Sequence, residues 1–98
     1  MILPKLEYKT DENFKKTQIT KLKEEVIELE NSKTIDNELE EIFDIMQVCL
    51  SLLYKYNIVK INKASKKHLQ KLKNRGWKFC REKTFSLIEI NNSPYFFK

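Results

Sequence analysis

The 98-residue chain contains few residues that interrupt helices, with one glycine, Gly76, and two prolines, Pro4 and Pro94. Long helices are therefore the default expectation between these residues. The chain also has only two cysteines, Cys49 and Cys80, without a CxxC motif or a neighbouring histidine, which argues against a structural zinc site. Cys49 lies in an apolar run and is typical of a small core residue in a protein of a reducing compartment.

A long apolar run is missing as well. The most apolar stretch, residues 42–53, contains Asp44, Gln47 and Ser51 and is too short to cross a bilayer. The first residues contain no apolar segment of the kind found in signal peptides. We therefore expect a cytoplasmic protein with no membrane partner, built as a single small domain over residues 1–98.

Charge is divided unevenly along the chain, whose formal net charge is +5. Residues 1–47 hold 12 of the 14 acidic residues, whereas residues 60–83 hold 10 of the 19 basic residues and one acid. A basic stretch of this kind favours a polyanionic partner such as nucleic acid, nucleotide phosphates or a membrane surface. Because the first half is acidic, a protein that merely coats DNA is disfavoured. A site that joins carboxylates, a cation and phosphates would use both halves.

The spacing of apolar residues predicts an all-α fold with three main helices. The first helix is expected over residues 14–30, with Thr17 as a candidate N-cap. It carries one apolar stripe with helical spacing, formed by Ile19, Leu22, Val26 and Leu29. The second helix is expected over residues 36–56 and is capped by Thr34 or Asp36.

The second helix has apolar residues on nearly every side. A helix that is apolar all round is buried all round, and three helices in one small chain cannot cover it. We therefore predict that another subunit packs on this helix. The result would be a homo-oligomer, dimer or tetramer, in which a bundle of four or more helices is completed.

The third helix is expected over residues 61–74, with Gly76 as its C-terminal signal. Its apolar residues are sparse, so we expect an edge helix with a wide basic face. Residues 1–13 are expected to be extended. Residues 78–98 are rich in aromatic and β-branched side chains and are expected to form short strands or an extended tail. The helical core would then span residues 14–77.

Two pairs of carboxylates have the same spacing on the first two helices. Glu25 and Glu28 are three residues apart, as are Glu41 and Asp44, so each pair shares one face of its helix. If the two helices are antiparallel neighbours, the four carboxylates surround one space. Such oxygen ligands suit a hard cation that keeps some waters for phosphates to replace. The sequence therefore predicts a Mg²⁺ site, with Mn²⁺ able to substitute.

A solvated helix face is the alternative for these pairs, since similar pairs are common in helices rich in Lys and Glu. Asp44 is the residue that most favours a cation. It stands between Phe43 and Ile45 in the most apolar segment and is expected to be buried. Because an unpaired buried carboxylate is costly, Asp44 needs a positive partner, which is either a metal ion or a lysine.

The order ExxE, twelve intervening residues and ExxD, which runs from Glu25 to Asp44, resembles a known family pattern. It is similar to that of the all-α nucleoside triphosphate pyrophosphohydrolases, in particular their MazG-like branch. Glu24 extends the first half to the EExxE form of that branch. The string HLQKLKNRGW also resembles the K-x-x-x-R segment of the family's third helix, with Lys71 and Arg75 in those places. The resemblance covers about residues 14–77.

The resemblance implies hydrolysis of an NTP or dNTP between the α and β phosphates, giving a monophosphate and pyrophosphate in nucleotide-pool house-cleaning. It implies that Glu24 or Glu25 acts as general base, and that Lys71 and Arg75 bind phosphates. The implied ligands of one or more Mg²⁺ ions are Glu25, Glu28, Glu41 and Asp44.

Trp77 could stack on a nucleotide base, although packing of the third helix onto the body is the favoured role. Two other functions stay open. One is a non-catalytic nucleotide- or protein-binding member of the same fold. The other, less favoured because nucleic acid is not the expected partner, is a basic nucleic-acid-binding module that uses residues 60–83.

Overall fold

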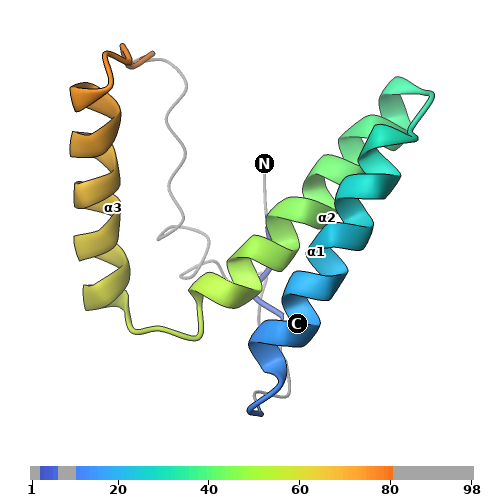
Figure 1. Cartoon of the computed structure of the whole chain (residues 1–98), viewed down its shortest axis with the longest axis horizontal. Helices are drawn as coiled ribbons and strands as arrows, with labels where there is room; N and C mark the ends of the chain where they lie inside the picture. The colour runs from blue at the N-terminus through green and yellow to red at the C-terminus, as the bar shows by residue number, and fades with distance from the viewer. Residues whose placement is uncertain (1–2, 7–10, 81–98) are drawn as a thin grey trace.

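The computed structural model describes residues 3–6 and 11–80 of the chain. These residues form three helices, α1 (Phe14–Glu30), α2 (Ile35–Leu53) and α3 (Ile58–Asn74). The described residues contain no strand, so the all-α fold is confirmed for this part of the chain (Figure 1). The predicted strands or extended tail fall mainly on residues 81–98, which lie outside the described residues.

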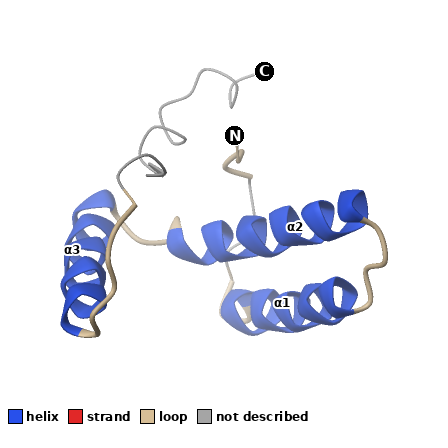
Figure 2. Ribbon diagram, turned by 90° about the horizontal axis from the view of Figure 1, so that it is seen from above, coloured by secondary structure: helices blue, strands red, loops and turns tan. Residues whose placement is uncertain are grey.

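α1 and α2 lie side by side as an antiparallel hairpin (Figures 1 and 2). α1 has the predicted bounds, but its N-cap is Asn13, so the prediction of Thr17 as the cap is wrong. The backbone N–H of Thr17 already donates to the Asn13 carbonyl at 2.9 Å, inside the first turn. Thr34 caps α2 as predicted, because its side-chain oxygen accepts the N–H of Asn37 at 3.1 Å.

The contact between α1 and α2 is small and partly polar. Phe14 and Val48 are only 5% and 2% exposed. Between the helices the single proton of the buried Ser51 hydroxyl has two acceptors, the Gln18 side-chain oxygen at 2.9 Å and the Val48 carbonyl of its own helix at 2.6 Å. The N-terminal segment is held beside α2, where the Gln47 side-chain amide donates to a backbone carbonyl at 2.6 Å. The helix pair therefore depends on hydrogen bonds as well as on apolar burial.

The buried face of α1 is rotated to one edge of its predicted apolar stripe, of which Ile19, Leu22 and Leu29 are half-buried. Phe14, Gln18 and Glu25 are the buried residues of this helix. Leu22 is half-buried beside them, whereas Val26 is 40% exposed. The Glu25 carboxylate and the Gln18 amide consequently occupy buried positions of α1 at which apolar side chains would be expected.

α2 ends at Leu53 and α3 begins at Ile58, so both boundaries lie three residues before the predicted ones. Asn57 is the reason, because its side-chain oxygen accepts the backbone N–H of Lys60 at 2.9 Å and caps the start of α3. The predicted stop at Gly76 is confirmed. Gly76 has φ +87°, and the next N–H, that of Trp77, reaches back to a carbonyl of the last turn at 3.1 Å.

α3 stands apart from the hairpin formed by α1 and α2 (Figures 1 and 2). None of its residues is buried, as expected for an edge helix. Trp77 is 66% exposed, so the favoured packing of this residue onto the body is not seen within residues 3–6 and 11–80. No helix in these described ranges has the length and apolar character needed to cross a membrane.

α2 keeps much of its apolar surface uncovered. Ile35, Leu39 and Ile42 are 75%, 50% and 37% exposed. Cys49 is exposed too, so the prediction that it is a core residue is wrong for the chain by itself. An apolar face of this size on one helix is unusual for a chain that works alone.

Candidate metal centre

Glu25, Glu28 and Glu41 come together between the two helices of the hairpin. Each offers one carboxylate oxygen, and these three oxygens all lie within 4.8 Å of one another. Glu25 and Glu28 share a face of α1 because three residues turn an α-helix by about 300°, close to a full turn. Glu41 reaches them from α2, so the group joins residues 25 and 41 across the helix contact.

The carboxylates of this group differ in burial. Glu25 is only 8% exposed, Glu41 is half-buried and Glu28 is exposed. One oxygen of Glu25 and one of Glu41, Oε2 in both, are buried and accept no hydrogen bond from any described residue. Buried carboxylate oxygens without a donor are costly, and they mark a place for a cation or a proton.

Among the described residues, Lys21 forms an ion pair with this group. Its ammonium nitrogen lies 3.8 Å from Oε1 of Glu25, one turn away on α1. The Lys21 side chain is 56% exposed, so water screens this ion pair and its contribution is small. One exposed lysine does not balance three carboxylates.

The pKa values of Glu25 and Glu41 also reflect the burial and the close spacing of these carboxylates. Burial, together with the close carboxylates of Glu25 and Glu28, raises the pKa of Glu41 from 4.5 to about 7. Burial is also the main cause that raises the pKa of Glu25, with added repulsion from Glu28 and Asp44. Near neutral pH this group therefore holds a proton readily, or binds a cation in its place.

Asp44 lies near the group but is not part of it. Its charge contributes to the raised pKa of Glu25, yet Asp44 is exposed and is absent from the set of three converging oxygens. The prediction that Asp44 is buried is therefore wrong. Its neighbours Phe43 and Ile45 point to other sides of α2, because successive residues are turned by about 100°. Glu24 is exposed as well and lies outside the group.

The predicted phosphate-binding residues are not brought to the carboxylates. Lys71 lies in the last turn of α3, Arg75 follows as its C-cap residue, and Trp77 comes two residues later. All three are exposed, and α3 stands apart from the hairpin that carries the glutamates (Figure 1). A pocket that includes both sets of residues would require another position of α3 or another copy of the chain.

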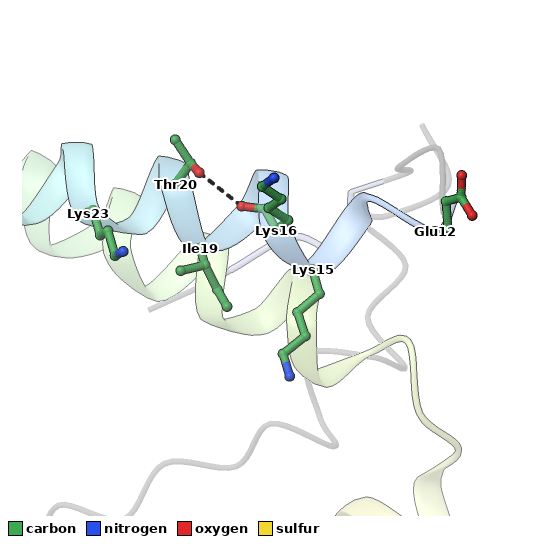
Figure 3. Close-up of a pocket in the computed structure, with 6 residues that line it drawn as sticks. All are labelled: Glu12, Lys15, Lys16, Ile19, Thr20 and Lys23. Carbon is green, nitrogen blue, oxygen red and sulfur yellow. Dashed lines mark hydrogen bonds between the residues drawn. The ribbon is translucent and has the colours of Figure 1, made fainter.

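A shallow hollow of about 460 Å³ lies on the first half of α1. Figure 3 shows that the ammonium groups of Lys15, Lys16 and Lys23 do not converge on one point. The Thr20 hydroxyl donates to the Lys16 carbonyl at 3.0 Å instead of facing a ligand. The residues that line the hollow are Glu12, Lys15, Lys16, Ile19, Thr20 and Lys23. None of the three grouped glutamates lines it, so the hollow is not part of the metal centre.

Two polar features of the helix contact had no place in the sequence-based interpretation. The buried Gln18–Ser51 pair has no signal in the sequence, because the residues are far apart along the chain. The Lys21–Glu25 pair does have a signal in the sequence, because a lysine and a glutamate four residues apart in a helix often form an ion pair.

Comparisons with known protein families, with curated proteins and with solved structures found no match to this chain. The resemblance to the MazG-like branch is therefore carried by the motif residues and their spacing.

Proposed function

We propose that this chain is a Mg²⁺-dependent nucleoside triphosphate pyrophosphohydrolase of the MazG-like type, which converts an NTP or dNTP to the monophosphate and pyrophosphate. One observation supports this proposal above the others. Oxygens of Glu25, Glu28 and Glu41 lie within 4.8 Å of one another, and two carboxylate oxygens of the group are buried without a donor among the described residues. A purely structural role would not require three converging carboxylates.

The donor set fits Mg²⁺, which prefers hard oxygen ligands and keeps several waters. Glu25, Glu28 and Glu41 would hold the ion, and Asp44, one turn after Glu41, would be the fourth ligand. Mn²⁺ accepts the same donors. When bound, the ion would neutralise charge on the phosphates and lower the pKa of a bound water.

The side chains have separate roles in this proposal. Burial raises the pKa of Glu25, and a carboxylate with a raised pKa is a stronger general base for water. Glu24 is the second candidate for that role, although it lies outside the group. Lys71 and Arg75 would bind the phosphates once α3 lies over a hairpin, and Trp77 would be placed to stack on the base.

The protein would act as a homo-oligomer, dimer or tetramer, in the cytoplasm, where nucleotide pools lie. The exposed apolar face of α2 supports the expectation of another subunit.

The test measures pyrophosphate release from a panel of NTPs and dNTPs with Mg²⁺ at micromolar protein. Glu41→Gln should abolish release, whereas Glu40→Gln, at an exposed position outside the group, should retain it. Loss of release in Glu24→Gln with Mg²⁺ binding retained would assign the general base to Glu24, because Glu25→Gln also removes a proposed metal ligand. Absence of release from every nucleotide in the panel refutes the proposal.

A non-catalytic nucleotide- or protein-binding role is the second candidate. The separation of α3 from the hairpin favours it, because Lys71 and Arg75 do not complete a pocket with the glutamates in this arrangement. Thermal stabilisation by a nucleotide without any pyrophosphate release would support this role instead of catalysis.

A basic nucleic-acid-binding module is the third candidate. It is favoured by the exposed α3, which carries six lysines and no acidic residue. Contacts to phosphates would make binding to DNA or RNA strongly dependent on salt. Absence of binding at low salt would exclude it.

A further inference from the structure

One face of α2 carries an apolar repeat with the spacing of a coiled coil. We call this set of residues the α2 seam. The steps between successive members are 4, 3, 4, 3 and 4 residues, which is the heptad pattern of a and d positions. The members of the α2 seam are Ile35, Leu39, Ile42, Met46, Cys49 and Leu53.

The α2 seam faces away from the partner helix in the hairpin. At about 100° per residue its six members lie on one side of α2. Val48 and Ser51, the buried residues that meet α1, lie on the opposite side. Within the described part of the chain the seam is largely open, with Ile35 75% exposed and Leu39 50% exposed.

The α2 seam is also symmetric about position 44. Ile42 and Met46 lie two residues before and after it, and Leu39 and Cys49 lie five residues before and after it. Ile35 and Leu53, nine residues to either side, continue the pattern. Two antiparallel copies of α2 centred at this position would therefore match every member of the seam with a member of the other copy. In each match, heptad position a of one copy faces heptad position d of the other.

Charge selects the same orientation. Residues 36–44 contain five acids and no base, whereas residues 45–57 contain one base, Lys55, and no acid. Parallel helices would place ten carboxylates side by side, which is repulsive. Antiparallel helices place each acidic half beside the uncharged half of the other copy, and they also align the helix dipoles favourably.

We propose that two copies of this chain pair through the α2 seam, antiparallel, about a twofold axis that passes beside position 44. The contact is isologous, because the same face is used by both copies. Glu41 and Asp44 lie on the side of α2 that faces α1, so the interface leaves the carboxylate group free. Dimerisation and metal binding are therefore separable properties of α2.

Another apolar strip could compete for the seam. α3 carries Ile58, Ile61, Leu69 and Leu72 on one side, and none of these residues is buried. Nevertheless the strip of α3 is shorter than the α2 seam, with four apolar residues against six, and the polar Ser65 lies at its centre. A chain that covers its own seam would be a monomer, which the following measurement detects.

Sedimentation equilibrium of the full chain tests the contact. The wild-type chain should be a dimer at micromolar concentration. Leu39→Lys should weaken dimerisation more than about 100-fold, because it buries an unpaired ammonium in a seam layer. Val59→Lys is the matched control, since Val59 is an equally apolar, 73% exposed residue outside the seam, and it should remain a dimer. Both variants should keep their helical circular dichroism.

Two results overturn the proposal. One is a wild-type chain that stays monomeric at 100-fold higher concentration. The other is a Leu39→Lys variant that dimerises as well as the Val59→Lys control.

A short thiol cross-linker tests the orientation in a Cys80→Ser background, which removes the other exposed thiol. Antiparallel pairing predicts little cross-linking through Cys49 alone and efficient dimer cross-linking after Leu39→Cys, because position 39 faces Cys49 of the other copy. Within one chain these positions are about 15 Å apart along α2, too far for the reagent. Efficient cross-linking through Cys49 alone would show that the helices are parallel. Absence of cross-linking both with Cys49 alone and after Leu39→Cys would exclude the antiparallel register centred at position 44. Neither test uses metal binding or pyrophosphate release, so their outcomes are independent of the proposed activity.

Discussion

Glu25 on α1 and Glu41 on α2 direct carboxylate oxygens into the same space, and one oxygen of each is buried without a donor among the described residues. Two helices that pack in this way concentrate like charge at their contact. Neutralisation of these groups by protons or a cation therefore stabilises the hairpin.

The stability of the metal-free chain should fall as pH rises from about 5 to about 8. Glu41 has a folded pKa of about 7 against an ordinary value of 4.5, and that of Glu25 is raised as well. Between these values the folded chain binds more protons than the unfolded chain, so each rise in pH favours unfolding. Thermal unfolding in a chelator at a series of pH values measures the slope. Glu41→Gln should flatten it, and a slope of opposite sign would contradict the raised pKa values.

Mg²⁺ should raise the melting temperature more at pH 8 than at pH 5. At the lower pH a proton already occupies Glu41, whose pKa is about 7, and competes with the ion. Thermal unfolding with and without Mg²⁺ at both pH values measures the difference. Glu41→Gln should lose most of the effect and Glu40→Gln should keep it. An equal rise in all proteins would indicate nonspecific ion binding.

Ser51→Ala should destabilise the hairpin by about 1–2 kcal/mol. The change removes the buried hydroxyl that links the two helices, which lies 2.9 Å from the Gln18 oxygen and 2.6 Å from the Val48 carbonyl. Urea unfolding followed by circular dichroism gives the free energy. Thr20→Ala is the control, because the Thr20 hydroxyl makes an exposed bond to a carbonyl of its own helix, and it should change stability much less.

Gly76→Ala should weaken the C-terminal end of α3 by about 1–2 kcal/mol. Gly76 has φ +87°, and a Cβ there would meet nothing within 4 Å, so the cost comes from the backbone alone. Amide hydrogen exchange in the last turn of α3 reports the change locally. Gly76→Asn should have an intermediate effect, since asparagine tolerates this conformation better than alanine. Equal exchange in all three proteins would contradict the role of the turn.

The helices could be predicted from the sequence because their signals are local. Apolar spacing gave the bounds of α1, and Thr34 and Gly76 have side-chain and backbone properties that favour helix ends. The boundary between α2 and α3 was missed because Asn57 suits both the end of one helix and the cap of the next. Only the bond from the Lys60 N–H to its side chain decides between these roles.

The candidate site shows where local signals end. The spacing of Glu25 and Glu28 predicts only that they share a helix face, whereas in the structure Glu25 is buried in the helix contact. The burial of Asp44 was inferred from its sequence neighbours, but the face of α2 that meets α1 is set by partners such as Gln18, which lie far away in the sequence. Which carboxylates converge therefore depends on the rotation of each helix about its own axis, and sequence spacing does not determine that rotation.

The separation of α3 from the hairpin makes the folded chain a strong electric dipole. Residues 24–44, at the closed end of the hairpin, hold nine acids and one base, whereas residues 58–78 hold eight bases and no acid. A chain of net charge +5 should consequently be retained by anion exchangers as well as by cation exchangers at low salt.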